Sequence, residues 1–440
     1  MVSFFPEDVV LIKLLIRDSD TTWISIANLL NGVSRLRDVA IVGVGQSRFG
    51  NRFDVRIDEL AFEAVKEALI DAGLELKDIK FMVQGCAGVW TAEDSPAVIC
   101  ADYCGVLPKG SMRVEAMCAS GSAALLIGYN AVASGYADLV LVLGVEKMHE
   151  LPTPLQIERM GRGGGSYLWE FENFGLTFPG YYALHATSYM SKYGLREEDL
   201  AEVAVKNHYY GAMNPKAQFR REITVDDVMK SRYIAWPLKL YDCCPLTDGS
   251  SVAILASEDV ARKLTDTPIW INSIGAATGS SLLINREKFL KLDYCGLESA
   301  VRAAEEAYRR AGIELDNPVK HIDVACVHDC FTIAEIMAYE DLRFCRRGEG
   351  VNLVREKQTY NGGLIPVNLD GGLKTKGHPI GATGVSMIYT LTKQLRGEYG
   401  KYADPKAQAT IRRGKALAHN VGGTGHYAYV TILSLEKPNR

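Results

Sequence analysis

The sequence has no surplus of basic residues, no long block of like charges and no apolar run of transmembrane length. Lysine and arginine number 49 against 53 aspartates and glutamates, which gives a formal net charge of -4. Proteins that bind nucleic acid or anionic membranes usually carry basic runs, and a membrane-spanning helix needs about 20 apolar residues. With 48% hydrophobic and 23% charged residues, the composition is that of an ordinary soluble globular protein.

The ten cysteines lack the spacing of a disulfide framework or of a zinc site. Two pairs, Cys100 with Cys104 and Cys326 with Cys330, have no matching second pair. In a chain of this length, irregularly spaced thiols fit a reducing compartment, where they stay free for packing or chemistry. We therefore expect a cytoplasmic protein without a bound metal.

At 440 residues the chain is too long for a single compact core, so we expect two or three domains. Residues 1-36 stand apart as an N-terminal extension. Its apolar stretch Val9–Ile16 is interrupted by Lys13 and has neither a basic start nor a small-residue cleavage site, so a signal peptide is not expected. The extension is either an additional packing segment or the product of a start codon placed too far upstream.

Apolar, β-branched segments alternate with helical patterns from residue 38 onward. Residues 38–45, 79–85 and 137–145 have the composition of buried strands. The helical pattern over 58–73 ends in glycine, which commonly stops a helix. This alternation predicts an α/β fold with a central, mostly parallel sheet.

A short sequence segment from the first half of the chain is repeated in the second half. Residues 63–76 match residues 302–315, and each copy leads into a predicted strand. A second echo pairs Ala-Ser-Gly at 119–121 with Ala-Thr-Gly at 382–384. Because two matches occur in the same order, we expect two related halves.

The two halves are expected to span residues 37-262 and 263-440. The first contains an insertion over about 146-234, where the strand-helix alternation loosens. Within it, the glycine-rich run 161–166 lacks the Gly-Lys-Ser/Thr ending of a phosphate loop and is expected to be a flexible loop. Aromatic residues crowd the stretch 167–182, which either packs the insertion or forms an aromatic pocket wall.

One cysteine, Cys118, stands where a polar turn gives way to the small-residue run Ala119–Ala124. The positive end of a helix dipole favours a thiolate, so we expect the pKa of this thiol to be lowered. Cys118 is therefore a candidate nucleophile. The alternative is an inert buried thiol, which is a common fate of free cysteines.

Three further segments place reactive residue types at strand ends or in tight loops. His328 and Cys330 directly follow a predicted strand, and His378 stands in a Gly-His-Pro loop before a helix. The third segment is the run Asn420-Val-Gly422-Gly423, whose glycines let backbone N–H groups approach a ligand closely. Together the segments supply a thiol nucleophile, imidazoles, a second thiol and a backbone oxyanion hole, which are the parts of covalent acyl chemistry.

These blocks resemble those of the thiolase family, and most closely its sterol-carrier-protein-type and archaeal members. The likeness runs from about Asp38 to Leu435. Its blocks, in the family's order, are Cys-Ala-Ser at 118–120, His-Asp-Cys-Phe at 328–331, Gly-His-Pro followed by Gly-Ala-Thr-Gly at 377–384, and the late Asn-Val-Gly-Gly run. The resemblance implies a five-layered α-β-α-β-α core, built from two similar halves with a loop domain inserted in the first.

The resemblance also implies a two-step acyl transfer between a 3-oxoacyl-CoA and CoA. Cys118 would carry the acyl group, with His378 as its proton acceptor. His378 and His328, directly or through water, would donate hydrogen bonds to the thioester oxygen of the departing enolate. The backbone N–H groups of Cys118 and Gly422 would hold the acyl oxygen, with Asn420 and Gly423 in the same binding run.

The chain departs from the usual family pattern in three places. Ordinary thiolases have a cysteine where this sequence has Asn420, and Asn-Glu-Ala-Phe where it has His-Asp-Cys-Phe. The sterol-carrier-type resemblance therefore implies that Cys330 has taken over proton transfer. Tyr182 falls near a position where many thiolases have a histidine, so acetoacetyl-CoA is not assumed to be the substrate, and a bulky or aryl 3-oxoacyl group is the working expectation.

Two other hypotheses stay open at this stage. A decarboxylating ketoacyl synthase of the same superfamily needs one cysteine and two histidines, which Cys118, His328 and His378 would provide, but it has no need for Cys330. A thiolase-like subunit that binds acyl-CoA without turnover is the non-enzymatic alternative. The resemblance further implies CoA as substrate with no resident cofactor, a homodimer or homotetramer, and a small zinc-ribbon/OB-fold accessory subunit as partner.

Overall fold

The computed structural model describes residues 36–438, so the expected N-terminal extension lies outside the described residues except for its last position. The strands of the main sheet are β1 (Val39–Gln46), β2 (Phe81–Gly85), β3 (Gly110–Val114), β4 (Leu139–Glu146), β7 (Gly249–Ser257), β8 (Ile269–Thr278), β9 (Val324–Cys326), β10 (Lys415–Gly422) and β11 (Tyr427–Ser434). A separate short pair is β5 (Tyr233–Ala235) and β6 (Leu238–Lys239).

The helices of the described part are α2 (Ile57–Ala72), α3 (Pro96–Tyr103), α4 (Ser120–Ala133), α5 (Thr153–Arg162), α6 (Phe178–Tyr193), α7 (Glu197–Met213), α8 (Val225–Met229), α9 (Glu258–Leu264), α10 (Glu298–Ala311), α11 (Thr332–Asp341), α12 (Gly350–Arg355), α13 (Gly372–Thr375), α14 (Thr383–Leu395) and α15 (Tyr399–Tyr402). A short 3-10 turn, η2 (Met117–Ala119), precedes α4. None of these helices is long and apolar enough to cross a membrane.

The nine strands follow the order β3-β2-β4-β7-β1-β8-β11-β10-β9. Strand β2 runs parallel to β3 and β4, and β9 runs parallel to β10. The remaining neighbouring pairs of this sheet are antiparallel. The α/β class is confirmed, but the prediction of a mostly parallel sheet was wrong. Strand composition reports burial and not direction, and β7 follows β4 through a long insertion that returns it antiparallel.

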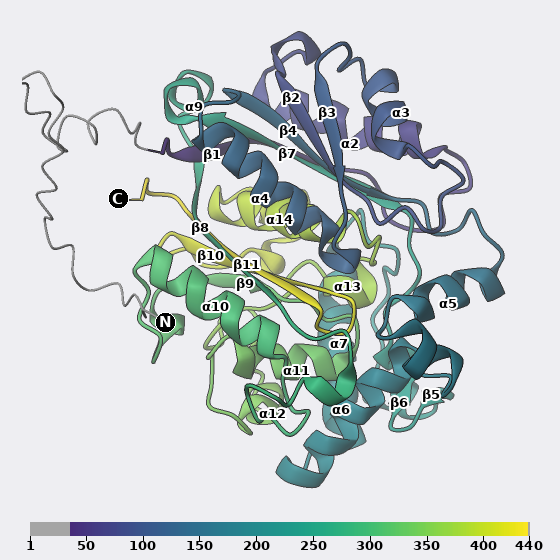
Figure 1. The fold of residues 1–440 in the computed structure, drawn as a ribbon. Helices are drawn as coiled ribbons and strands as arrows, with labels where there is room; N and C mark the ends of the chain where they lie inside the picture. Colours follow the sequence, from purple (N-terminus) through teal and green to yellow (C-terminus); the bar gives the residue numbers. More distant parts are fainter. Residues whose placement is uncertain (1–35, 439–440) are drawn as a thin grey trace, which may run out of the picture. The chain divides into compact units, whose positions relative to one another are not determined.

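The elements form five layers (Figure 1). Helix α2 packs on β1 and β7 on the outer side of the first half, and α10 packs on β8 and β11 on the outer side of the second. Between the two halves lie α4, against β2 and β4, and α14, against β7 and β10. The α-β-α-β-α arrangement implied by the resemblance is therefore confirmed.

The repeated segment, residues 63–76 and 302–315, occupies equivalent places in the two halves. Helices α2 and α10 both end at a left-handed glycine, Gly73 and Gly312, each with φ of 64°. A Cβ on Gly45 of β1 would overlap the α2 backbone, and a Cβ on Gly275 of β8 would overlap the α10 backbone in the same way. Glycine therefore permits the same close helix-to-strand approach in each half.

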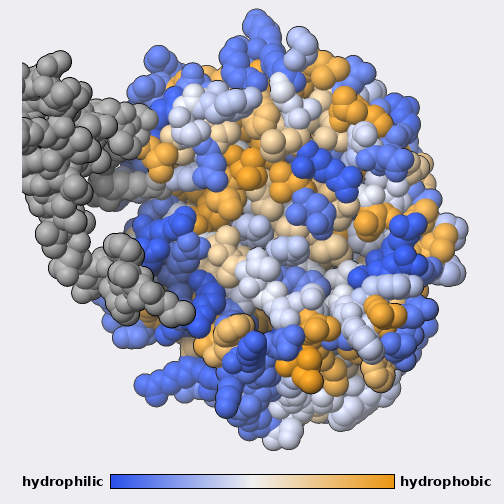
Figure 2. Space-filling view, viewed as in Figure 1, coloured by the Kyte–Doolittle hydropathy of each residue, from blue (hydrophilic) through white to orange (hydrophobic). Residues whose placement is uncertain are grey.

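Helix α10 also shows how the outer layer meets solvent. Its exposed side carries the ion pairs Arg302–Glu298 and Arg310–Glu306, each one helical turn apart. Hydrophilic side chains accordingly gather over this part of the surface (Figure 2).

The central helices α4 and α14 meet at their N-terminal ends. A Cβ on Gly121 would lie 2.7 Å from the Gly381 carbonyl oxygen and 3.2 Å from the Gly384 nitrogen. A Cβ on Gly384 would in turn overlap the backbone and side chain of Ser122. Only glycine allows this approach, which brings the Cys118 turn of one half beside the His378 loop of the other.

The insertion between β4 and β7 contains α5, α6, α7 and α8 together with the β5-β6 pair. The boundaries expected for the halves and for the insertion, 37-262, 263-440 and 146-234, stay a prediction.

Candidate active site

Cys118 is presented by a strained turn at the N-terminal end of α4. The preceding residue, Met117, has φ of 51°, a conformation that non-glycine residues seldom adopt. The Ser120 hydroxyl closes the turn, because it donates to the Met117 carbonyl at 2.6 Å and accepts from the Ala116 N–H at 2.9 Å. The sulfur therefore has a fixed position at the start of the central helix.

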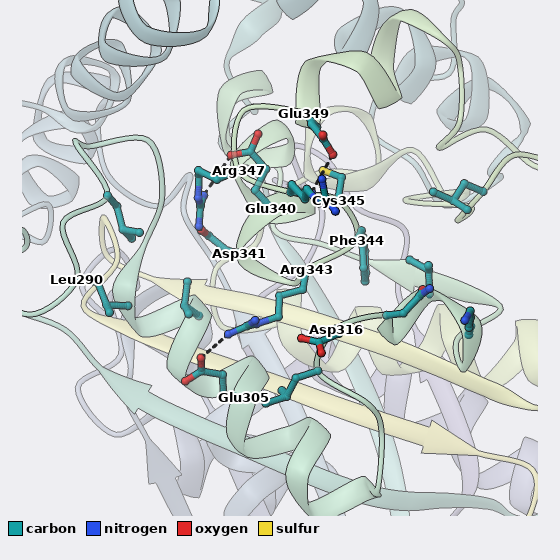
Figure 3. Close-up of a pocket in the computed structure, with 18 of the residues that line it drawn as sticks. Leu290, Glu305, Asp316, Glu340, Asp341, Arg343, Phe344, Cys345, Arg347 and Glu349 are labelled. Carbon is teal, nitrogen blue, oxygen red and sulfur yellow. Dashed lines mark hydrogen bonds and ion pairs between the residues drawn. The ribbon is translucent and has the colours of Figure 1, made fainter.

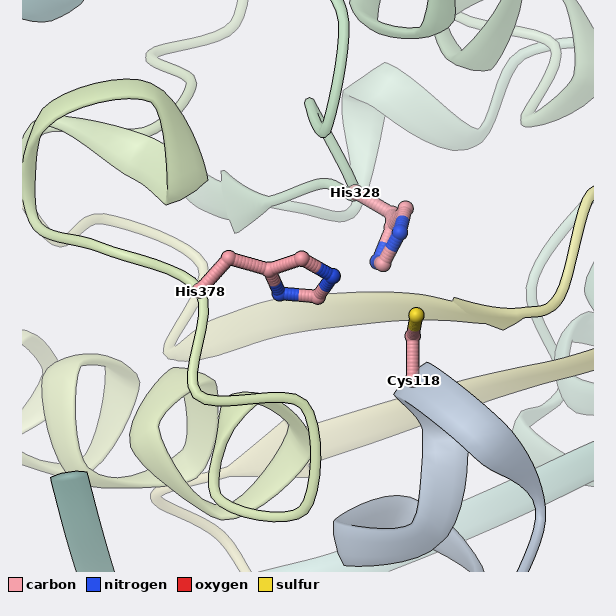
Figure 4. Close-up of side chains that lie close together, drawn as sticks. All are labelled: Cys118, His328 and His378. Atoms are coloured by element: carbon pink, nitrogen blue, oxygen red, sulfur yellow. The ribbon is translucent and has the colours of Figure 1, made fainter. Parts of the chain in front are cut away.

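Two imidazoles from the other half point toward this sulfur (Figure 4). His328 follows β9, and His378 lies in the loop between α13 and α14. One nitrogen of each ring and the Cys118 sulfur all lie within 4.8 Å of one another. The rings meet edge to face, with centroids 5.1 Å apart. The three side chains are buried, and the structure thus brings together three of the residues predicted from separate blocks.

The hydrogen bonds of His378 determine which of its nitrogens carries the proton. Its Nδ1 lies 2.7 Å from the Thr383 hydroxyl, whose own hydrogen is donated to the Pro379 carbonyl. Because that hydroxyl can then only accept, Nδ1 carries the hydrogen and Nε2 keeps a free lone pair. Nε2 has no other partner among the described residues. His378 is therefore set up as a base toward the thiol.

The opposite tautomer follows for His328. The Asn420 amide nitrogen donates to the Cys118 carbonyl at 3.0 Å and lies 3.1 Å from His328 Nδ1, while its oxygen accepts from the Ser122 hydroxyl. A carbonyl oxygen can only accept, so the amide orientation is fixed and Nδ1 of His328 must accept as well. The proton then resides on Nε2, which makes His328 a hydrogen-bond donor into the site.

A cysteine and two histidines at this spacing also resemble a zinc-binding set. A ligating imidazole nitrogen must be free of its proton. Nε2 of His328 retains its proton because Asn420 occupies Nδ1 as a donor. The hydrogen-bond pattern therefore favours proton transfer over metal binding at these three residues.

Burial keeps both Cys118 and His378 uncharged. It raises the pKa of the Cys118 thiol, and a nearby carboxylate, Glu146, acts in the same direction. The N–H groups of Gly423 and of Cys118 itself act in the opposite direction but do not prevail. Burial also lowers the pKa of His378 to about 3. The expectation of a lowered thiol pKa was wrong, because removal from water outweighs the dipole of the helix.

Cys330 lies in the same cavity as Cys118. This enclosed space of about 170 Å³ is lined by both thiols, by His378 and by apolar side chains that include Trp90 and Phe178. Burial raises the pKa of Cys330, and Cys118 and Asp329 act in the same direction. The two sulfurs thus face one small chamber, as two-thiol acyl chemistry requires.

Gly422 and Gly423, in the Asn-Val-Gly-Gly run, have different roles. A Cβ on Gly422 would overlap the Ala116 carbonyl, so this residue packs directly against the Cys118 turn. Gly423, with φ of 64°, is the one whose N–H interacts with the sulfur. The backbone donors that face Cys118 in the described structure are thus its own N–H and that of Gly423.

A residue that sequence reasoning missed is Glu146, at the end of β4. Its buried carboxylate accepts from the N–H groups of Ala87 at 2.9 Å, Gly88 at 2.8 Å and Gly381 at 3.1 Å. It thereby ties the loop after β2 to the loop that carries His378, and burial raises its pKa to about 7. A charged residue closing an otherwise unbroken apolar strand was the available signal.

Sequence reasoning also missed Cys244, whose N–H donates to the Cys330 carbonyl at 2.9 Å and which lines the cavity. The aromatic stretch 167–182 contributes only in part. Phe178 lines the cavity, whereas Trp169 and Phe174 are 61% and 81% exposed. Of the two expectations for this stretch, the aromatic pocket wall therefore holds for Phe178 and not for Trp169 or Phe174.

A larger cavity of about 940 Å³ lies elsewhere, beside α10 and the segment after α11 (Figure 3). Several of its charged side chains are paired with one another, as in Arg343–Glu305 at 2.7 Å and Arg347–Asp341 at 2.7 Å. Cys345 is its single thiol, and no histidine is among the described residues that line it. This cavity therefore lacks the nucleophile and base that the smaller one has.

The sequence matches two family models, "Thiolase, N-terminal domain" over residues 39–259 and "Thiolase C-terminal domain-like" over residues 285–435. It is 41% identical to an acetyl-CoA acetyltransferase of Methanothermobacter thermautotrophicus, over 91% of this chain and all of that protein. It is 32% identical to sterol carrier protein 2 of Gallus gallus, over 91% of this chain and 72% of that protein.

A further relative is the benzoylsuccinyl-CoA thiolase subunit BbsB of Thauera aromatica, 32% identical over 88% of this chain and 95% of that one. Among solved structures, a chain of the Ltp2-ChsH2(DUF35) aldolase matches with a TM-score of 0.75 and 27% identity. That match covers 91% of this chain and 98% of the other.

The neutral state of Cys118 and His378 can be tested by alkylation of the native protein with iodoacetamide between pH 6 and pH 9. Because burial raises the pKa of Cys118, its thiolate fraction should rise about tenfold per pH unit across this range, without a plateau. The rate at Cys118 is measured by peptide mass spectrometry, with the denatured protein as control. A plateau below about pH 8 would instead show a preformed thiolate-imidazolium pair.

Proposed function

Because the chain belongs to the thiolase family, we propose that it transfers an acyl group between a 3-oxoacyl-CoA and CoA through an acyl-enzyme on Cys118. The observation that carries the proposal is the pair of opposite imidazole tautomers beside one thiol. His378 offers a lone pair and His328 offers a proton, both within 4.8 Å of the Cys118 sulfur and of each other. Acyl transfer through a thiol needs both functions.

In the first step, Nε2 of His378 accepts the Cys118 proton while the sulfur attacks the 3-keto carbon. The bond between C2 and C3 then breaks, and the acetyl-CoA enolate leaves. The N–H of His328 donates to the thioester oxygen on which the negative charge resides. The Cys330 thiol gives its proton to the enolate carbon, which leaves Cys330 as a thiolate and Cys118 as an acyl thioester.

In the second step, a CoA thiol gives its proton to the Cys330 thiolate and attacks the acyl carbon. The oxyanion that forms is held by the N–H groups of Cys118 and Gly423. When the tetrahedral species collapses, acyl-CoA leaves and Cys118 recovers its proton from His378. Removal of one such oxyanion donor typically costs about 3 kcal/mol of transition-state stabilisation. In reverse, the same steps form a Claisen condensation.

We further propose an uncharged acyl group as large as one aromatic ring. The cavity of about 170 Å³ beside Cys118 is close in size to an apolar cavity of about 150 Å³ that binds benzene. None of the described residues that line it carries a charge at neutral pH. The similarity to a benzoylsuccinyl-CoA thiolase subunit supports an aryl substituent.

The two alternative functions are not favoured. The relatives include an acetyl-CoA acetyltransferase and a thiolase subunit. A decarboxylating condensing enzyme has no use for a second thiol, yet Cys330 shares the cavity with Cys118. A non-catalytic subunit has no use for a base and a donor with opposite tautomers.

Assembly and location belong to the same proposal. The solved relative is named Ltp2-ChsH2(DUF35) aldolase, and BbsB is named as a subunit. These names support an accessory partner for this chain, and the expected zinc-ribbon/OB-fold type stays a prediction. The homodimer or homotetramer and the cytoplasmic location stay predictions as well.

The acyl-enzyme can be tested by mass spectrometry of the protein after incubation with acetyl-CoA. We expect one acetyl group on Cys118, and we expect Cys118→Ala to lower thiolysis of 3-oxoacyl-CoA at least about 10³-fold. Cys345→Ala, a thiol of the larger cavity, is the matched control and should behave as the parent. Acetylation at another residue, or an active Cys118→Ala variant, would refute the proposal. Release of carbon dioxide from malonyl-CoA would favour the condensing-enzyme alternative.

The tautomer of His328 can be tested with Asn420→Asp. An aspartate presents an acceptor to His328, so the ring proton should move to Nδ1 and the donor at Nε2 should be lost. We expect kcat to fall about 10² to 10³-fold. Ser122→Ala is the control, because it removes a contact to the amide oxygen without changing the atom that faces His328. Equal kcat values for Asn420→Asp and the parent would contradict the assigned tautomer.

The size limit can be tested with Leu246→Trp, which fills part of the cavity. We expect kcat/KM for 3-oxo-3-phenylpropanoyl-CoA to fall at least about tenfold, while acetoacetyl-CoA changes little. Leu315→Trp, on the larger cavity, is the matched control. A parent enzyme that cleaves acetoacetyl-CoA and fails to cleave the phenyl substrate would refute the aryl proposal.

A further inference from the structure

The mouth of the cavity beside Cys118 is formed by the β5-β6 hairpin of the insertion. Ile234 and Leu240 line this cavity, and they are 38% and 44% exposed. All other described residues that line it are buried or half-buried. The cavity therefore meets solvent beside these two side chains.

The hairpin has little support of its own. Its two strands form a sheet separate from the nine-stranded one, and the hairpin lies beside α6 (Figure 1). An isolated two-stranded hairpin is only marginally stable in water. Leu238 anchors β6 in the core, whereas Tyr233, Ile234 and Trp236 are exposed. The position of β5 therefore depends on contacts made by its side chains.

The two faces of the hairpin have different partners. Successive side chains of a strand point to opposite faces. Tyr233 pairs with Lys239 across the hairpin, and the Lys239 ammonium lies 4.4 Å from the centroid of the Tyr233 ring. These two side chains thus share one face. Their neighbours in the chain, Ile234 and Leu240, share the other face, which is the one toward the cavity.

A single carboxylate holds the face that is turned away from the cavity. It belongs to Glu197, the first residue of α7. Its Oε2 accepts from the Tyr233 hydroxyl at 2.9 Å, and its Oε1 accepts from the Trp236 indole N–H at 3.2 Å. The Lys239 ammonium forms an ion pair with the same carboxylate. Three donors, from both strands and from the turn between them, therefore converge on one side chain.

We propose that Glu197 is a positioning residue that holds the β5-β6 hairpin over the mouth of the cavity, so that the hairpin limits which acyl-CoA esters reach Cys118. The inference rests on the proposed function for the identity of the ester. When the carboxylate is removed, the three donors lose their common partner. The face that carries Ile234 and Leu240 is then no longer fixed.

The segment that leaves the hairpin is anchored independently of Glu197. The Lys239 N–H donates to the Asp242 carboxylate at 2.7 Å, which also accepts at 2.8 Å from the hydroxyl at the start of α11. The Cys244 N–H donates to the Cys330 carbonyl at 2.9 Å. Loss of the Glu197 carboxylate therefore frees the mouth and leaves the reacting groups in place.

The test compares two alkylating reagents of different size, iodoacetamide and 5-iodoacetamidofluorescein, on the native parent and Glu197→Ala proteins. Both reagents carry the same reactive group, so the ratio of their rates at Cys118 reports access and not thiol reactivity. We expect the ratio of the large to the small reagent to rise about tenfold, because loss of a hydrogen bond to a charged group shifts an opening equilibrium by about this factor. Glu198→Ala, at the next residue of α7, which is exposed, is the matched control and should give the parent ratio.

Tyr233→Phe is a milder variant at a position that is 53% exposed. It removes one of the three donors and retains the ring. We expect the rate ratio to rise about threefold. Tyr136→Phe, at another exposed tyrosine, is its control. An unchanged ratio in Glu197→Ala overturns the inference, and an unchanged ratio in Tyr233→Phe does so where Glu197→Ala does not fold.

Kinetics separate positioning from a general loss of structure. In Glu197→Ala, kcat/KM for 3-oxododecanoyl-CoA should rise about tenfold relative to kcat/KM for acetoacetyl-CoA, because the longer chain needs the wider mouth. An equal fall for both esters would show a structural defect and overturn the positioning role. A parent protein that cleaves neither ester overturns the proposed function, while the ratio of alkylation rates still decides whether Glu197 holds the mouth.

Discussion

The close contact between the N-terminal ends of α4 and α14 is the constraint on which the site depends. Gly121, Gly381 and Gly384 let two helices from different halves of the chain approach within backbone distance. One helix begins at the nucleophile and the other follows the imidazole base. Because α4 packs on β2 and β4, and α14 packs on both β7 and β10, the distance from sulfur to imidazole is set by the fold and not by flexible loops.

Burial then decides the protonation states. The same desolvation that raises the pKa of both thiols lowers those of the histidines, so the resting site contains neutral groups. Charge develops only during reaction, at positions where Asn420, Thr383 and Gly423 have already oriented a donor or an acceptor. Such preorganisation is the usual source of large rate effects in enzymes.

Much of this site could be predicted from the sequence. Cys118, His328, Cys330 and His378 stand in short blocks whose residue types and order are specific; the structure places Cys118, Cys330 and His378 around one cavity and His328 beside Cys118 and His378. Strand direction could not be predicted, because β4 and β7 look alike in composition. The pKa of Cys118 could not be predicted either, because it depends on segments distant in the sequence that bury the thiol and exclude water from it. The choice between Gly422 and Gly423 as oxyanion donor depends on a positive φ, and the stacking of Tyr182 on Phe331 joins residues about 150 positions apart, so no local pattern reports either.

Part of the apolar wall of the cavity beside Cys118 comes from segments that carry none of the acid-base residues. Trp90, Met148 and Leu246 come from three different loops of this kind. A single substitution at one of these positions can therefore change which acyl groups fit the cavity, while the proton-transfer geometry stays intact. Related proteins can in this way come to accept different acyl groups while the catalytic mechanism stays the same.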